Sequence, residues 1–174
     1  MNSFVLVQVL GMITLVLFVI SLQQRTKESF LLWQTVGTLI FVFQYLLTNK
    51  ITGAITFAIV AIRGLVFYYY KKRGLNPSTV VLVAFIAILS IATYFSWQNV
   101  WSIIPLIATT AKTWGTWQDN MKLTRKTSLL GQSCMIVYNL TATMYTGALT
   151  EICNLASTLI AMWRFDFSRN KIMK

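Results

Sequence analysis

Glu151 is the only carboxylate that stands inside a long apolar run of this sequence, and Asn154 and Thr158 follow it three and seven residues later. Side chains at these spacings share one face of a helix. A carboxylate and an amide on one face of an apolar helix could bind a polar solute or carry a proton. The alternative is a glutamate near the end of its helix, either solvated or stabilised by the positive end of the helix dipole.

A second polar stripe lies in the preceding apolar run. Asn139 has Gln132 seven residues before it and Thr143 four residues after it. An amide offers donors and acceptors together, which suits an uncharged polar solute; the alternative is a hydrogen bond that joins two helices. By helical rise, Asn139 and Asn154 lie at a similar depth, about 10 Å from the same surface. We therefore expect them to face one solute.

Two cations, Arg63 and Lys112, also stand within apolar runs. Arg63 could attract an anionic group of a solute. The alternative for both is that the long side chain extends to the nearest aqueous interface, and we interpret Lys112 in that way. A direct pair between Arg63 and Glu151 is not expected, because their depths differ by about 13 Å. The predicted substrate-binding residues are Asn139, Asn154, Glu151, Arg63 and Gln132.

The residue types that most enzymes need are missing from the sequence. It has no His, no pair of neighbouring carboxylates, no nucleophile elbow, no phosphate-binding loop and no metal-ligand cluster. We expect no enzymatic activity, no cofactor and no metal. The net charge of +11 would suggest nucleic acid in a polar chain. Here the basic residues are separated by apolar runs and form no continuous face, so nucleic-acid binding is not expected.

The composition and the long apolar runs of the sequence indicate that membrane-spanning helices carry these polar residues. Of the 174 residues, 56% are hydrophobic and 11% charged, whereas a soluble domain carries about 25% charged residues. An apolar run of roughly 17–25 residues is long enough to cross a bilayer as a helix. Seven runs qualify, which predicts an all-α polytopic membrane protein: 5–22, 30–47, 51–70, 80–97, 101–117, 128–145 and 148–165.

The distribution of Lys and Arg predicts the orientation. The N-terminus and the connections after the second, fourth and sixth runs hold only Lys50. The other connections and the C-terminal end of the chain, counted from Arg164, hold all remaining basic residues except Arg63 and Lys112: Arg25, Lys27, Lys71, Lys72, Arg73, Lys122, Arg125, Lys126, Arg164, Arg169, Lys171 and Lys174. The N-terminus should face outside and the C-terminus the cytoplasm.

Two stretches, 27–63 and 126–164, share weak internal similarity. Their common landmarks are a basic entry, a Leu-Leu pair followed by Gln, a Thr-Gly-Ala turn and a closing Arg (Lys27 and Lys126; Gln34 and Gln132; 52–54 and 146–148; Arg63 and Arg164). Two parallel copies of three helices need one helix between them, so the pattern predicts a 3+1+3 arrangement. The first repeat would cover 1–73, the linker helix 74–99 and the second repeat 100–174.

The second half resembles a known family. The sequences WSIIPLIATTAKTWGTW, MKLTRK and VYNL…TGALTEI…AMWRF resemble the YgjV-type bacterial inner-membrane proteins over nearly the whole chain. That family is distantly similar to the SWEET and PnuC-type facilitators, which share the 3+1+3 plan. The resemblance implies an Asn three residues before each closing Arg, but Val60 and Ala161 stand there. In sugar-carrying SWEETs an Asn on each third helix contacts substrate, so the resemblance does not imply sugar transport for this chain, and likeness of fold alone assigns no function.

The residues and the resemblance together predict a small facilitator for a polar metabolite in a bacterial inner membrane. It would alternate access between two three-helix bundles, with Asn139, Asn154 and Gln132 contacting solute, Glu151 at the outer mouth and Arg63 deeper. The alternative is a non-transporting scaffold that binds a membrane partner. The expected partners are membrane lipid and a small polar solute, and a homo-oligomer is compatible with the sequence.

Overall fold

The computed structural model describes residues 3–47, 51–95, 97, 100–141 and 145–167. This part of the chain is helical and contains no strand, which confirms the all-α prediction. A short 3-10 turn, η1 (Val100–Ser102), precedes the fifth helix, and a π-helical turn, η2 (Trp163–Phe167), follows the last. The long helices are α1 (Ser3–Leu22), α2 (Lys27–Leu47), α3 (Ile51–Lys72), α4 (Thr79–Phe95), α5 (Ile103–Trp117), α6 (Met121–Thr141) and α7 (Tyr145–Met162).

The start of α6 differs from the prediction. The helix begins at Met121 and not at Ser128, so Arg125 and its basic neighbours lie on its first two turns and not in a connection. Asn120 is the cause, because its side-chain Oδ1 accepts a hydrogen bond of 2.9 Å from the backbone N–H of Lys122. This contact caps a helix N-terminus. A scan for apolar residues does not detect a helix whose first turns are polar.

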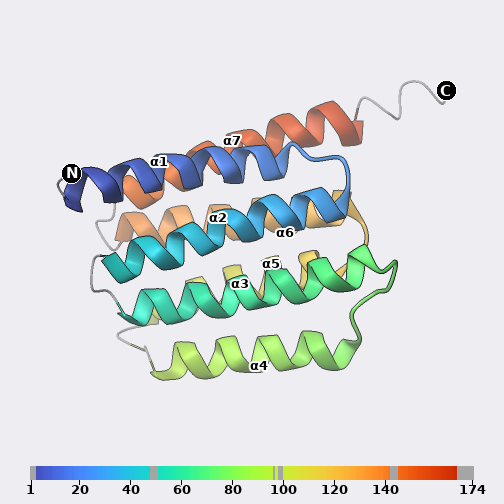
Figure 1. The fold of residues 1–174 in the computed structure, drawn as a ribbon, viewed down its shortest axis with the longest axis horizontal. Helices are drawn as coiled ribbons and strands as arrows, with labels where there is room; N and C mark the ends of the chain where they lie inside the picture. The colour runs from blue at the N-terminus through green and yellow to red at the C-terminus, as the bar shows by residue number, and fades with distance from the viewer. Residues whose placement is uncertain (1–2, 48–50, 96, 98–99, 142–144, 168–174) are drawn as a thin grey trace.

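The helices lie along a common axis in two layers (Figure 1). In this view α1, α2, α3 and α4 form the near layer from top to bottom, and α7, α6 and α5 lie behind them. Within the layers α2 packs against α1 and α3, and α6 packs against α5 and α7. The layers meet where α1 contacts α7 and α4 contacts α5. α1 begins at one end of the bundle, and η2 lies at the other end (Figure 1).

Small residues let neighbouring helices approach closely. A Cβ built on Gly64 of α3 would lie 2.3 Å from Oγ1 of Thr35 on α2. A Cβ on Gly115 of α5 would lie 1.7 Å from Oγ1 of Thr127 on α6. Glycine is required at both positions, because any larger residue would overlap the threonine. Contacts between small residues of this kind are typical of helices that pack without a hydrophobic driving force.

Polar residues are buried and large apolar residues are exposed. The described buried residues include Arg63, Gln132 and Asn139, with many Thr and Ser side chains. Exposed apolar side chains cover the outside of the helices, and Val80 and Phe95 on α4 are 77% and 83% exposed. The helices of the described part fall short of the combined length and hydropathy required to cross a membrane.

Candidate functional site

The polar face of α7 is buried against α6. Asn154 and Thr158 are both buried, as is Gln132 on α6. The Thr158 hydroxyl lies 3.0 Å from Oε1 of Gln132 and 2.9 Å from the backbone carbonyl oxygen of Asn154, so its hydrogen is shared between two acceptors. The side-chain Oδ1 of Asn154 is buried and accepts no hydrogen bond from the described residues. One acceptor on this face is therefore free to take a donor from a ligand.

Glu151, one turn earlier on α7, faces Lys112 of α5. Nζ of Lys112 lies 3.8 Å from Oε2 of Glu151, and the two side chains are 24% and 18% exposed. This distance makes an ion pair but exceeds that of a hydrogen bond. Oε2 is buried and accepts no hydrogen bond from the described residues. Glu151 thus adds a second acceptor on this face of α7 that has an ion-pair partner in Lys112 but no hydrogen bond from the described residues.

The interpretation of Lys112 as a residue that extends to the aqueous interface is wrong. Side chains on a helix tilt toward its N-terminus, and α5 and α7 run in the same direction, so Lys112 points toward the start of α7. Gly131 of α6 leaves room for it, because a Cβ there would lie 2.7 Å from Cε and 2.8 Å from Cγ of Lys112. The lysine stem crosses α6 at this glycine and reaches Glu151.

Asn139 is buried near the end of α6. α6 ends at Thr141 and α7 begins at Tyr145, so by helical rise Asn139 lies about 3 Å from its helix end and Asn154 about 13 Å from its own. The sequence-based prediction that Asn139 and Asn154 lie at equal depth assumed that the helix of Asn139 continues to Tyr145. Because α6 ends at Thr141, that prediction is no longer supported. The same rise brings Gln132 to about the level of Asn154. Thr143 lies outside the described residues.

Arg63 forms a separate polar contact between the layers. It is buried on α3, and its Nη1 donates a hydrogen bond to the hydroxyl of Thr113 on α5. Its Nε has no hydrogen-bond partner among the described residues. No described carboxylate forms an ion pair with Arg63, and none joins it to Glu151. The guanidinium of Arg63 is a buried cation held by a neutral partner.

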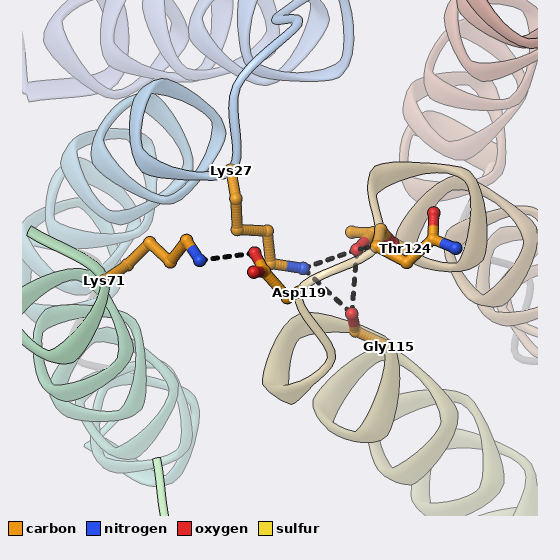
Figure 2. Close-up of polar contacts among 6 residues, drawn as sticks. Lys27, Lys71, Gly115, Asp119 and Thr124 are labelled. Carbon is orange, nitrogen blue, oxygen red and sulfur yellow. Dashed lines mark hydrogen bonds and ion pairs between the residues drawn. The ribbon is translucent and has the colours of Figure 1, made fainter. Parts of the chain in front are cut away.

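Lys27, the first residue of α2, is a second buried cation that joins the layers (Figure 2). It is 5% exposed, and its ammonium donates hydrogen bonds to the backbone carbonyl oxygen of Gly115 and to the hydroxyl of Thr124. The Thr124 hydroxyl lies 2.8 Å from the same carbonyl oxygen. The side chain therefore links α2 to both α5 and α6.

Burial is the main influence on Lys27. Loss of water around the ammonium lowers the pKa of Lys27 from 10.5 to about 7. Among the neighbouring charges, Asp119 raises this pKa, and Lys71 and Arg63 lower it. Lys27 precedes the apolar run that begins at Phe30. Its charge changes in the physiological pH range, which a lysine in water would not show.

Further polar contacts join the layers at the same end of the bundle. Lys71 at the end of α3 forms an ion pair with Asp119, which precedes α6 (Figure 2). Nε2 of Gln23, after α1, donates a hydrogen bond of 2.9 Å to the backbone carbonyl oxygen of Ser157 on α7. Arg125 of α6 donates a hydrogen bond of 2.9 Å to the carbonyl oxygen of Gln24. The two layers are thus tied by polar contacts at the end opposite Asn139.

The contacts of Lys27 were not predicted from the sequence, in which this residue is an orientation signal and the basic entry of the first repeat. Lys27 and Arg125 are both buried, which a count of charges in connections cannot detect. The weak repeat is no signal of this burial, because it aligns Lys27 with Lys126, which is exposed. Cys134 and Cys153 are free thiols. In the described residues no group of three or more Asp, Glu or Cys side chains could hold a metal ion.

Comparison with known proteins decides the family. The model of the family Imp-YgjV, bacterial inner membrane protein, matches residues 5–169. The chain belongs to the Imp-YgjV family. This confirms the resemblance and identifies the chain as a bacterial inner membrane protein. No curated protein and no solved structure matches this Imp-YgjV chain, so the distant similarity to SWEET and PnuC-type facilitators stays a prediction.

Proposed function

We propose that this Imp-YgjV protein spans the inner membrane seven times, with its N-terminus outside and its C-terminus in the cytoplasm. The support comes from the family and from the distribution of side chains. Large apolar residues are exposed around the bundle, whereas buried positions are rich in Thr, Ser, Asn, Gln and Arg. In water such an exterior would be a large aggregation-prone surface. In a bilayer it meets lipid, and the small polar interior packs the helices together.

The two layers support a 3+1+3 repeat. A half-turn about the bundle axis would bring α1–α2–α3 onto α5–α6–α7 and keep the direction of each helix (Figure 1). Each trio is built around its middle helix, α2 or α6. α4 stands outside this relation and would serve as the linker. Parallel repeats with such an axis occur in transporters, where substrate lies near the midplane between the halves.

The solute site of our proposal lies on the inner face of the second trio. The observation that carries it is a pair of buried acceptors on one face of α7, Oδ1 of Asn154 and Oε2 of Glu151, that no described donor satisfies. A buried acceptor without a partner is costly, so a solute with hydrogen-bond donors would be stabilised there. Lys112 and Arg63 would contact an anionic group, and Gln132, whose Oε1 accepts a hydrogen bond from Thr158, would line the site. Asn139 would contact the solute nearer the outer end.

Alternating access would follow from the contacts between the trios. One group of these polar contacts lies at the end of the bundle that the charge distribution assigns to the cytoplasm. The contacts of this group are made by Lys27, Lys71, Gln23 and Arg125. They would close the cytoplasmic side while the outer side admits solute. Rocking of one trio against the other would break them and open the opposite side. No nucleotide-binding motif occurs in the sequence, so a gradient would drive transport without enzymatic chemistry.

The test begins with ligand discovery. A library of polar metabolites is screened for thermal stabilisation of the purified protein, and each hit is measured for exchange in proteoliposomes. Asn154→Ala and Glu151→Gln should reduce exchange at least tenfold, because the first removes a free acceptor and the second removes the negative charge and replaces one acceptor oxygen by a donor amide. Asn76→Ala is the matched control, since Asn76 is exposed between α3 and α4, and it should exchange normally. Exchange that is unchanged in both site variants would refute the proposed site.

A membrane scaffold is the second candidate, and one observation favours it. Lys112 pairs with Glu151, and Thr158 bonds to Gln132, so part of the cluster joins helices to one another. For a scaffold, substitutions in this cluster would lower the thermal midpoint, and no metabolite would stabilise the protein. For a carrier, Asn154→Ala would lower exchange without a comparable loss of stability.

A further inference from the structure

Three arginines meet around one aromatic ring where α7 ends. The Cζ atoms of Arg25, Arg125 and Arg164 lie 5.2, 5.1 and 5.2 Å from the ring centroid of Phe165. Any two of these guanidinium groups are therefore no more than about 10 Å apart. The residues come from the α1–α2 connection, α6 and η2, so three separate segments contribute to one cluster.

The charge of this arginine cluster is not balanced within the described part of the protein. Asp166 is the carboxylate beside it, and its Oδ1 lies 2.7 Å from Nη1 of Arg125. The other ion pairs use Asp119 and Glu151. Glu28 is exposed and forms no ion pair with a described residue. Among the described residues Arg25 and Arg164 thus have no carboxylate partner, and their common contact is a neutral ring.

The cluster combines a fixed part with an accessible part. Arg125 is 3% exposed and held by Asp166 and by the carbonyl oxygen of Gln24, whereas its Nε has no hydrogen-bond partner in the part of the chain that the structure describes. Arg25 and Arg164 are exposed, and contact with the aromatic ring limits their freedom. The π-helical turn η2 carries Arg164, Phe165 and Asp166, and such turns are frequent at functional sites.

We propose that Arg25, Arg125, Arg164 and Phe165 form a binding site for a phosphate group. Planar guanidinium groups bind phosphate oxygens in pairs, and an anion placed among three of them would relieve their mutual repulsion. The cluster lies at the end of the bundle that the proposed arrangement assigns to the cytoplasmic surface, where anionic phospholipid head groups are concentrated. A lipid phosphodiester and a free phosphate share this chemistry. The assignment of this end to the cytoplasmic surface rests on the proposed function, but phosphate binding by the cluster does not depend on whether the protein transports a solute.

The test is thermal unfolding of the full chain in a neutral detergent. The additives are short-chain phosphatidylglycerol, phosphatidylcholine with the same chains, and inorganic phosphate. Phosphatidylglycerol should raise the midpoint by about 2–4 °C more than phosphatidylcholine. The R25Q/R164Q double variant should lose this difference, and R164K should retain part of it. R73Q is the matched control, because Arg73 is also exposed and lies 4.3 Å from the Tyr69 ring, and it should behave as wild type.

The outcomes separate the sources of phosphate. An effect of phosphatidylglycerol that R25Q/R164Q abolishes assigns the site to a lipid head group, and the same dependence with inorganic phosphate alone assigns it to a free phosphate. No effect of either additive, or an effect that R25Q/R164Q leaves intact, would overturn the site. A protein that shows the effect but exchanges no metabolite would refute the carrier and leave the phosphate site standing.

Discussion

Lys112 of α5 reaches Glu151 of α7 across α6, at a distance of 3.8 Å between Nζ and Oε2. The crossing is made where α6 carries Gly131. One ion pair therefore connects α5 and α7, the two outer helices of this trio, because the lysine side chain passes over α6 at its glycine. The pair is loose and partly exposed, so a polar ligand can compete for either charge without breaking a short hydrogen bond.

The pair should show coupling in a double-mutant cycle. Lys112→Met or Glu151→Gln alone leaves one partly buried charge without its counter-ion, whereas the double variant leaves none. We expect a coupling energy of about 1–3 kcal/mol, measured from the free energy of unfolding of the purified protein. Strictly additive effects of the two substitutions would mean that the ammonium and the carboxylate do not interact.

The contact between α2 and α3 should reject a side chain at Gly64. Gly64→Ala places a Cβ 2.3 Å from Oγ1 of Thr35, and overpacking of this kind costs about 1–3 kcal/mol. Thr35→Ala should cost little, because Oγ1 of Thr35 is buried and forms no hydrogen bond with the described residues. The double variant should recover most of the stability in a thermal unfolding assay. A double variant as unstable as Gly64→Ala would contradict this packing.

Lys27 should make stability depend on pH. Its pKa is about 7 in the folded protein and 10.5 in the unfolded chain, so the unfolded state binds more protons between these values. The free energy of unfolding should then rise with pH from about 7 upward, by at most about 1.4 kcal/mol per pH unit. Below pH 7 both states are protonated and the contribution is flat.

Two variants isolate this effect. Lys27→Met should remove the rise in stability between pH 7 and pH 9. Lys122→Met should keep it, because Lys122 is exposed on α6. A rise that persists in Lys27→Met would assign the pH dependence to another group.

Arg63 should separate stability from transport. The guanidinium is buried against a neutral hydroxyl with no carboxylate partner among the described residues. A buried charge of this kind is weak support for a fold, so Arg63→Met should leave the thermal midpoint unchanged or raise it. Proteoliposome exchange should fall at least tenfold if Arg63 attracts the solute. A large loss of stability with normal exchange would make Arg63 a purely structural residue.

Local sequence was sufficient for most of the helices. Each depends on a continuous apolar run and on polar residues that interrupt it, and α3 begins at the predicted Ile51. The start of α6 could not be read from apolar residues, because its first turns are polar and its start depends on the cap at Asn120. The expected depth of Asn139 relative to Asn154 changed for a different reason: depth was counted from helix ends, and α6 ends at Thr141 rather than at the predicted Tyr145.

The sequence by itself determined the helical class, the family and the polar stripes on 132–139 and 151–158, because each follows from residue types at fixed spacing along the chain. Only the tertiary structure decided which charges are buried and what each one contacts. Lys27 and Lys112 look like ordinary interfacial lysines in the sequence, yet one is enclosed by α5 and α6 and the other crosses Gly131 to Glu151. Burial and the direction of a long side chain depend on neighbours that are distant in sequence.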